Sequence, residues 1–261
     1  MSRTQRTMKT AAYSVFTRMI TLLVSFAART VFIKTIGTTY LGVSGLYSEI
    51  IRILSFTELG FGTAMTFAMY KPVAEHDQGA VRRLLRFNRF VNLAVASLIA
   101  VLGLCILPLL PYIVRGADFL SLSELRIYFL IFVFNTAVSY LSTYIFLYLN
   151  ALQRPYILNI LSTVIRVITS LCQIIVLLLT GNFLFYLLTE AGILLLSRVG
   201  LSIYFRKKWP KLTYLGKDNI TSEERKSIIR DVRGLIVHRL SSIAVHSTDN
   251  LLISIIRLLC A

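Results

Sequence analysis

The amino-acid sequence predicts an all-α membrane protein with several spanning helices. Of its 261 residues, 56% are hydrophobic and only 15% are charged, whereas about a quarter of a soluble domain is charged. The apolar residues form long blocks without the alternation of a membrane barrel, and helices satisfy every backbone polar group in lipid. We therefore expect a polytopic helical bundle of six spans and part of a seventh.

The spans follow from the length of each apolar block, because a helix that crosses the bilayer needs about 20 mostly apolar residues. The candidate spans are residues 11–36, 42–70, 89–113, 123–148, 157–180 and 182–205, and a seventh begins near residue 234 and runs to residue 261. The first block contains Arg18 and has no convincing small-residue cleavage site, so it is interpreted as an uncleaved span and not as a signal peptide.

The chain divides into three parts on this interpretation. Residues 1–205 form a first transmembrane lobe of six helices, 206–233 form a basic cytoplasmic loop, and 234–261 begin a truncated second lobe. The stretch TSEERKSIIRDVR, residues 221–233, is expected to be a short amphipathic helix that starts at Thr221. Trp209 follows three basic residues and is expected at the membrane interface.

The connections between spans carry most of the formal net charge of +16. If the spans alternate in direction, the basic segments fall on one side of the membrane: residues 3–9, 71–89, 154 and 206–233. The opposite side receives 37–40, 115–124 and 180–182, which hold few basic residues. The positive-inside rule then places the N-terminus in the cytoplasm and explains the charge without nucleic acid as a partner.

The sequence offers no pattern for a metal, a cofactor or an enzyme. Cys105, Cys172 and Cys260 each lie within an apolar run, and their spacing matches neither a disulfide framework nor a metal site. Walker A, GxSxG, HExxH and DxD motifs do not occur. We expect no metal, no cofactor and no catalytic residues.

The first two spans contain charged residues, although each costs at least ~2.5–3.5 kcal/mol in mid-membrane. Arg18 and Arg29 are separated by 11 residues, which places them within about 20° of each other around a helix. Glu49 and Arg52 form an i,i+3 pair that can neutralise itself partly. This pair suits either a helix–helix contact or a polar cavity. Glu58 follows among small residues and suits either a structural bond or a coupling site.

The seventh span carries Arg239, Ser242, His246 and Asp249 along one helical seam. His246 and Asp249 could form a proton-responsive pair or an ordinary structural contact. Arginine predominates within the spans, and a cationic interior suits an anionic substrate such as a phosphate, because guanidinium keeps its charge and binds phosphate in a bidentate manner.

One segment resembles a known family. Residues 29–77, RTVFIKTIGTTYLGVSGLYSEIIRILSFTELGFGTAMTFAMYKPVAEHD, resemble the start of bacterial polysaccharide-export flippases of the Wzx type. These proteins belong to the multidrug/oligosaccharidyl-lipid/polysaccharide exporter superfamily. The likeness lies in the Ile-Gly end of the first span and in the blocks YLGVSGLY, LSFTELGFGTA and YKP. Residues 248–254, TDNLLIS, resemble the opening of the second half in that family.

The resemblance implies two six-helix lobes around a cavity that opens alternately to each side of the bacterial cytoplasmic membrane. It implies a lipid-linked sugar diphosphate as cargo and other polysaccharide-assembly membrane proteins as possible partners. Arg18, Arg29 and Arg52 would bind the pyrophosphate, and Arg239 and Asp249 would contribute from the second lobe. Family members have about twelve to fourteen spans, so a chain of seven is expected to be truncated or to assemble with a partner half.

Three other functions compete with a flippase. A cation-coupled multidrug exporter of the same superfamily would favour an acidic cavity, and the arginines argue against it. A membrane polysaccharide polymerase or ligase would be expected to have a large outer loop, whereas the predicted outer loops are short. A purely structural assembly subunit is the third. The sequence leaves open whether protons, sodium or voltage would supply the energy.

Overall fold

The computed structural model describes residues 3–55, 61–114, 120–152, 155–213, 220–223, 225–232 and 234. All regular structure in these ranges is helical. The elements are α1 (Arg3–Ile36), α2 (Thr38–Leu54), α3 (Phe61–Ala74), α4 (Gln78–Ile106), η2 (Leu107–Leu109), α5 (Leu110–Ile113), α6 (Leu122–Tyr140), α7 (Thr143–Ala151), α8 (Pro155–Thr180), α9 (Phe183–Lys208) and α10 (Pro210–Thr213).

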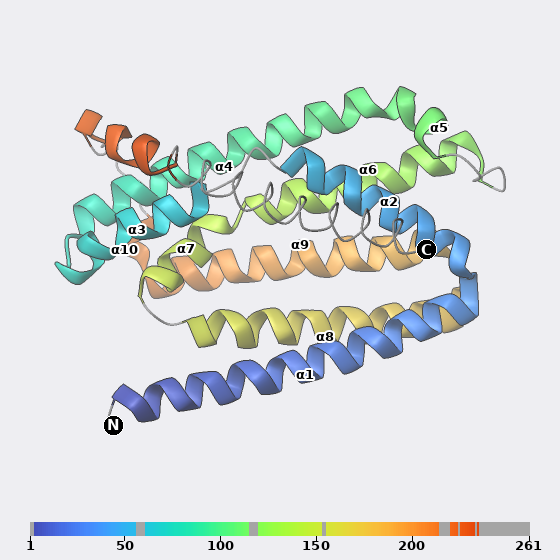
Figure 1. The fold of residues 1–261 in the computed structure, drawn as a ribbon, viewed down its shortest axis with the longest axis horizontal. Coiled ribbons are helices and arrows are strands. Elements are labelled where there is room, and N and C mark those ends of the chain that lie inside the picture. The colour runs from blue at the N-terminus through green and yellow to red at the C-terminus, as the bar shows by residue number, and fades with distance from the viewer. Residues whose placement is uncertain are drawn as a thin grey trace, which may run out of the picture.

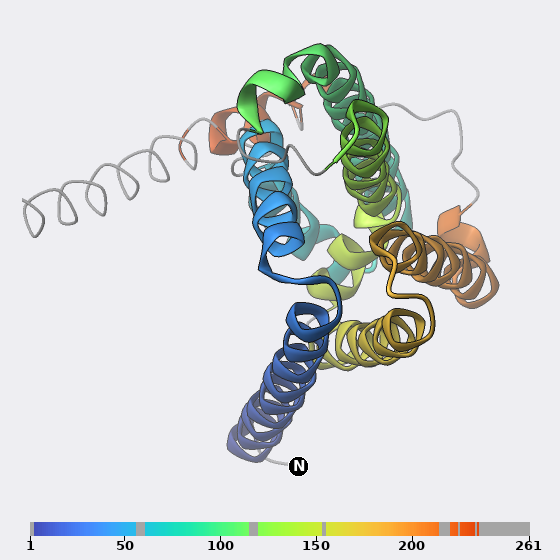
Figure 2. The same ribbon diagram turned by 90° about the vertical axis from the view of Figure 1, so that its right-hand side faces the viewer.

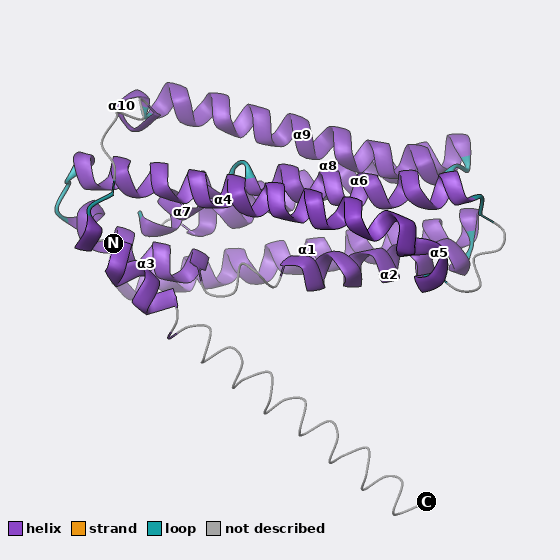
Figure 3. Cartoon of the chain, turned by 90° about the horizontal axis from the view of Figure 1, so that it is seen from above, coloured by secondary structure: helices purple, strands orange, loops and turns teal. Residues whose placement is uncertain are grey.

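The long helices lie side by side along one axis (Figures 1 and 3). Five stretches are long and apolar enough to cross a membrane: Tyr13–Ile36, Gln78–Ile113, Leu122–Ala151, Ile157–Thr180 and Phe183–Lys208. The prediction of an all-α, polytopic membrane bundle is therefore confirmed over the described residues. The predicted seventh span lies outside them, apart from residue 234.

The second predicted span, 42–70, is not one continuous helix in the structure. Helix α2 ends at Leu54 and α3 begins at Phe61. Figure 1 shows α2 and α3 following each other in the same direction along the bundle. The apolar block therefore predicted the path of the chain but missed its interruption.

Local polar residues set several helix ends. At Gly37 the backbone φ is 91°, a conformation that glycine adopts readily, and the chain reverses there between α1 and α2. The Asp77 carboxylate accepts the N–H groups of the first turn of α4. Ser121 and Glu124 form a capping box at the start of α6.

The fourth predicted span, 123–148, is divided into two helices where α6 meets α7. Thr136 and Ser139 donate their hydroxyls to the carbonyls of Phe132 and Thr136, at 2.9 and 2.7 Å. Such bonds often bend a helix, and α6 ends at Tyr140. Because α2 packs on α6 and α3 packs on α7, the two interrupted passes are neighbours.

Two apolar cores lie towards opposite ends of the bundle. The end at which the chain begins is termed the basic end, because basic connections gather there, and the opposite end is termed the far end. The far-end core is built from α1, α2, α5, α6, α8 and α9, and comprises Phe32, Val43, Tyr47, Leu110, Val114, Leu120, Leu125, Tyr128, Phe129, Val133, Leu177, Phe183 and Leu187. The basic-end core comprises Met65, Met69, Val81, Leu84, Leu85, Ile145, Leu147, Tyr148, Leu149, Ala151, Leu158, Phe205, Leu212 and Ile228. None of the α1 side chains that the structure describes, from Tyr13 onward, belongs to the basic-end core.

Helix α1 packs mainly along α8 and makes a smaller contact with α2. Figure 2 looks along the bundle from the far end and shows α1 and α8 as neighbours at one side of it. Helix α9 continues to Lys208, three residues into the segment expected to be a loop. Residues 225–232 are helical, and the Arg225 N–H donates to the Thr221 carbonyl at 3.0 Å, in agreement with a helix that starts there.

Candidate functional site

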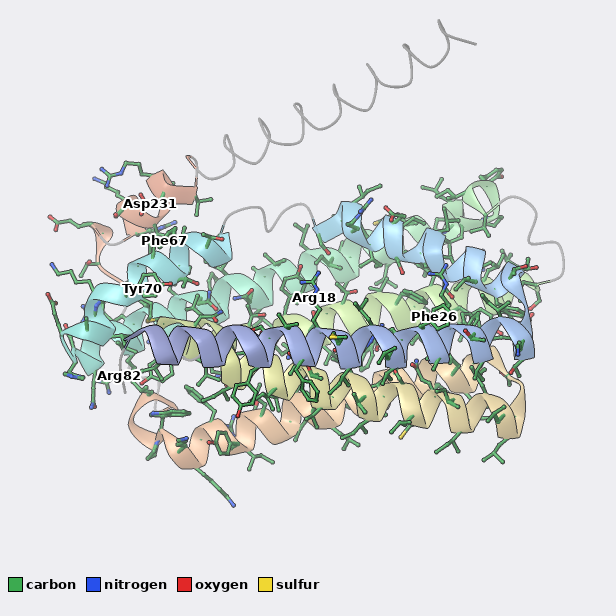
Figure 4. The ribbon with its side chains drawn as sticks, turned by 60° about the horizontal axis from the view of Figure 1, so that its bottom comes forward. Arg18, Phe26, Phe67, Tyr70, Arg82 and Asp231 are labelled. Carbon is green, nitrogen blue, oxygen red and sulfur yellow. The ribbon has the colours of Figure 1, made fainter. Side chains whose placement is uncertain are left out.

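Arg18 and Arg29 lie on one side of α1, because the helix is continuous through both residues. Both side chains are exposed. Figure 4 shows Arg18 rising from α1 towards the side on which α2 and α3 lie. Among the described residues, neither arginine has a carboxylate within salt-bridge distance. The first pass therefore presents two uncompensated positive charges outside its α8 contact.

The i,i+3 ion pair predicted by the spacing of Glu49 and Arg52 is present on α2. The Arg52 Nη2 atom donates to the Glu49 Oε2 atom. The side chains of Arg52 and Glu49 are 72% and 55% exposed, so the pair is not enclosed between helices in the described part of the chain. Because Glu49 offsets part of its charge, Arg52 offers less net positive charge than Arg18 or Arg29.

The other candidate residues fall outside the described residues. They are Glu58, Arg239, His246 and Asp249. Of the candidates within the described ranges, the structure brings together only Glu49 and Arg52. Roles in substrate binding or coupling for this set remain predictions.

Helix α8 has a polar edge that the sequence analysis did not predict. Asn159, Ser162, Arg166, Ser170 and Gln173 recur every three or four residues, which places them along one side of the helix. The Asn159 Nδ2 atom donates to the Ser14 Oγ atom of α1 at 3.4 Å. Ser170 and Gln173 are buried. The spacing of polar residues within 157–180 was the signal that would have revealed this edge.

The polar edge of α8 reaches a carboxylate on α9. The Gln173 Nε2 atom donates to the Glu190 Oε2 atom at 3.4 Å. The positive charge of Arg166 also interacts with Glu190. Where α8 and α9 pack together, a carboxylate is therefore hydrogen-bonded to an amide and lies within the electrostatic influence of a guanidinium.

Arg198 lies closer to the basic end of α9 and lines a different cavity. Its Cζ atom is 5.0 Å from the centroid of the Phe146 ring, in a cation–π contact. Its Nε atom is buried and has no hydrogen-bond partner within the part of the chain that the structure describes. Arg198, Arg206, Ser142 and Ser202 supply the polar lining of a cavity of about 260 Å³ between α9 and the α6–α7 junction.

A second polar cavity lies between the two interrupted passes. It has a volume of about 400 Å³ and is lined by α3 and α7. Hydroxyl and amide groups come from Thr63, Thr66, Tyr70, Thr143 and Asn150, and aromatic rings flank them. Hydroxyl, amide and aromatic groups suit the hydrogen-bonding edges and apolar faces of a sugar.

The basic connections gather at the basic end of the bundle. They include Lys71, Arg82, Arg83, Arg86, Arg206, Lys207 and Lys208, and Figure 4 labels Arg82 and Asp231 at this end. The N–H groups of Ala80 and Gly79, helped by Arg83, hold the pKa of the Asp77 carboxyl below its usual range. Among the described residues, no cluster of His, Cys, Asp or Glu side chains could hold a metal ion.

Comparison with known proteins yields one distant structural likeness. A MOP superfamily transporter from Pyrococcus furiosus, described as having a binding pocket of reverse polarity that suggests a different function, matches with a TM-score of 0.46 and 18% identity. The match covers 91% of this chain and 54% of that chain. A likeness this distant carries no argument about family or function. No protein-family model matches the sequence, and no curated protein matches it.

Proposed function

We propose that this chain is the first lobe of a membrane transporter that flips a lipid-linked oligosaccharide diphosphate across the bacterial cytoplasmic membrane. The observation that carries the proposal is the pair of exposed arginines, Arg18 and Arg29, which have no carboxylate partner among the described residues and lie on one side of a helix apolar enough to span the membrane. The resemblance of residues 29–77 to polysaccharide-export flippases supports the choice of cargo. The basic end would face the cytoplasm, in keeping with the positive-inside rule.

The spacing of the two arginines suggests how a diphosphate would pass. Eleven residues of helix correspond to about 16 Å along its axis. A diphosphate is shorter than this distance, so it would bind Arg18 and Arg29 in turn and not together. Arg18 lies nearer the basic end and would receive the headgroup first. Guanidinium suits this task because it stays charged in a low dielectric and forms bidentate bonds with phosphate.

The ion pair on α2 and the cavity between α3 and α7 would have secondary roles. Arg52 would release Glu49 in part when a phosphate competes for its guanidinium. Thr63, Tyr70 and Asn150 could bind the sugar hydroxyls of the same cargo. A negative charge that crosses the membrane experiences ~2.3 kcal/mol per 100 mV, so voltage could contribute to the driving force.

A second candidate function is a cation-coupled exporter, and one observation favours it. Glu190 is a carboxylate within a spanning helix and is bonded to Gln173 of α8. Ionisable groups at this depth are commonly coupling or transport sites. Replacement of Glu190 by Gln would abolish cation-driven transport in such an exporter. It would leave a purely voltage-driven flippase active.

The test is the amount of lipid-linked glycan in cells that lack this gene, measured by mass spectrometry of extracted lipids. We expect an undecaprenyl-type diphosphate oligosaccharide to accumulate and the restored gene to clear it. Arg18→Gln and Arg29→Gln should each slow clearance about tenfold, the value of one charge-assisted hydrogen bond. Lys34→Gln changes an exposed cation at the far end of the same helix and serves as the control.

Two results would contradict the proposal. One is normal clearance by both arginine variants at unchanged protein levels, which would leave a structural subunit as the better explanation. The other is the absence of any accumulated lipid-linked glycan in the deletion strain. Arg29→Lys separates charge from geometry, because lysine keeps the charge and loses the bidentate contact.

A further inference from the structure

Two adjacent cavities, which share three lining residues, lie at the basic end, outside the arginine site. One, of about 640 Å³, lies among the α3–α4 connection, α7 and the start of α10. The other, of about 430 Å³, lies among α7, α8 and α9. Leu152, Lys208 and Trp209 line both of them. The second cavity is walled mainly by aliphatic side chains, so together they form a groove with a polar mouth and an apolar interior.

The depth of the apolar part matches one leaflet of a bilayer. Along α9 its lining runs from Ser197 to Lys208. Eleven residues of helix correspond to about 16 Å, roughly half of the ~30 Å hydrocarbon core. A single acyl chain of one leaflet would therefore match the length of the groove from Lys208 to Ser197.

Lys208 lies at the mouth of the groove and contacts two aromatic side chains there. The Lys208 Nζ atom donates to the Tyr204 Oη atom at 2.8 Å. The same Nζ atom lies 5.0 Å from the centroid of the Trp209 ring. Trp209 in turn packs against Tyr148, with ring centroids 5.5 Å apart. An ammonium group has three donors, so the bond to Tyr204 leaves capacity for a phosphate oxygen.

Charge around the mouth favours an anionic occupant. Arg206, Lys207 and Lys208 occupy the last turn of α9. A basic residue near an anionic membrane surface contributes roughly 1 kcal/mol of attraction. Trp209 and Tyr204 are also the side chains that prefer the headgroup level of a bilayer.

We propose that this groove is a binding site for an anionic glycerophospholipid of the basic-end leaflet. Its acyl chain lies along α8 and α9, and its phosphate is bound by Lys208. The site is separate from the arginines of α1, and the proposal does not depend on the identity of the transported cargo.

Gly200 supplies a way to fill the groove without disturbing its walls. It lines the apolar cavity, and a Cβ atom added there would meet no atom within 4 Å. Gly192 lies on the same helix, also has open space at its Cβ position, and does not line the groove. Gly200→Phe and Gly192→Phe are therefore matched variants, one inside the groove and one outside it.

The experiment measures thermal unfolding of the purified full chain in detergent while lipid is added. The probes are dioleoylphosphatidylglycerol and dioleoylphosphatidylcholine. We expect phosphatidylglycerol to raise the Tm of the wild type with saturation, and phosphatidylcholine to raise it much less. Lys208→Gln should raise the phosphatidylglycerol concentration that gives half of the Tm shift by about fivefold. Lys207→Gln should raise this concentration by a smaller factor. Gly200→Phe should lose the effect, and Gly192→Phe should keep it.

Three outcomes would overturn the proposal. Equal stabilisation by the two lipids would show that the site does not select charge. Retention of the effect by Gly200→Phe would show that the groove is not where the acyl chain binds. Loss of the phosphatidylglycerol effect on addition of undecaprenyl diphosphate would assign the groove to a polyprenyl lipid. If Gly200→Phe fails to fold, an equal response of Lys208→Gln and Lys207→Gln would overturn the proposal instead.

Discussion

The far-end core and the basic-end core differ in whether they include α1. At the far end, Phe32 of α1 packs edge-on against Phe183 and Tyr186, with centroids 5.9 and 5.0 Å apart. The buried Tyr47 hydroxyl donates to the Leu125 carbonyl at 2.9 Å and ties α2 to α6. The basic-end core holds α3, α4, α7 and α9 together without any described side chain of α1.

This difference shows how the part of α1 with described side chains, residues 13–36, is held in the bundle. The part of α1 that carries Arg18 is supported by α8 and not by the basic-end core. Helix α1 is therefore anchored at its far end by apolar contacts, and its basic-end half is held to α8 partly by polar ones such as Ser14 to Asn159. A charged headgroup could approach Arg18 from the basic end without disrupting an apolar core.

The largest expected effect comes from two buried phenylalanines on the same helix. Phe183 and Phe205 are 2% and 0% exposed, and each lies in a different core. Replacement of either by alanine should lower the free energy of unfolding by about 3–5 kcal/mol, because a large cavity is created. Only Phe183→Ala should also speed hydrogen exchange throughout α1, since Phe183 contacts Phe32. Denaturant unfolding and hydrogen exchange in detergent measure the two effects.

Phe183→Ala and Phe205→Ala together test whether α1 depends on the far-end core alone. If Phe205→Ala speeds exchange in α1 as much as Phe183→Ala does, then α1 depends on both cores and is not anchored at the far end alone. Phe185→Ala, which removes a half-exposed ring from the same helix, is the control and should change the free energy of unfolding by less than about 1 kcal/mol.

A smaller effect is expected where α4 and α6 approach closely. A Cβ atom on Gly103 would lie 2.6 Å from Cγ2 and 2.9 Å from Cγ1 of Val133, which belongs to the far-end core. Gly103→Ala should therefore cost about 1–3 kcal/mol through overpacking. Gly192→Ala meets no atom within 4 Å and should be neutral or stabilising, because alanine favours helix. Equal thermal stability of the two variants would show that α4 and α6 can separate at no cost.

Most of the fold could be predicted from the apolar blocks alone. Each of the six predicted spans within 1–205 corresponds to one helix or to two consecutive helices, because about 20 apolar residues in lipid have few alternatives to a helix. The interruption between α2 and α3 could not be located in this way. Hydropathy averages over a window, so the end of α2 at Leu54, with Ser55 as its C-cap, leaves no mark in the average.

The candidate site was less predictable than the fold. Local spacing correctly indicated the pairing of Glu49 with Arg52, because partners three residues apart meet on any helix. The bond between Gln173 and Glu190 joins two helices, and which faces of α8 and α9 meet depends on tertiary packing. Close packing at Gly103 was missed for the same reason, since its partner Val133 lies on another helix.

The smallest expected effect is a difference in acid sensitivity between a helix cap at the basic end and a helix cap at the far end. Asp77 caps α4 at the basic end, and Asn182, which cannot ionise, caps α9 at the far end. Because the pKa of Asp77 is lowered, chiefly by the Ala80 N–H, its contribution to stability is present above the ordinary aspartate pKa of about 4. It is lost as the pH falls through the lower pKa of the folded protein. Asp77→Asn keeps the cap and should remove this acid sensitivity.

Hydrogen exchange in the first turns of α4 and α9, followed between about pH 5 and pH 2.5 and corrected for intrinsic rates, measures this prediction. The wild type should lose protection at the start of α4 as the pH falls, whereas the start of α9 should keep it. Asn182→Asp should transfer the acid sensitivity to α9, because an aspartate there would accept the Leu184 N–H that Asn182 now accepts. Loss of protection in α4 that persists in Asp77→Asn would mean that the Asp77 cap does not govern the response of α4 to acid.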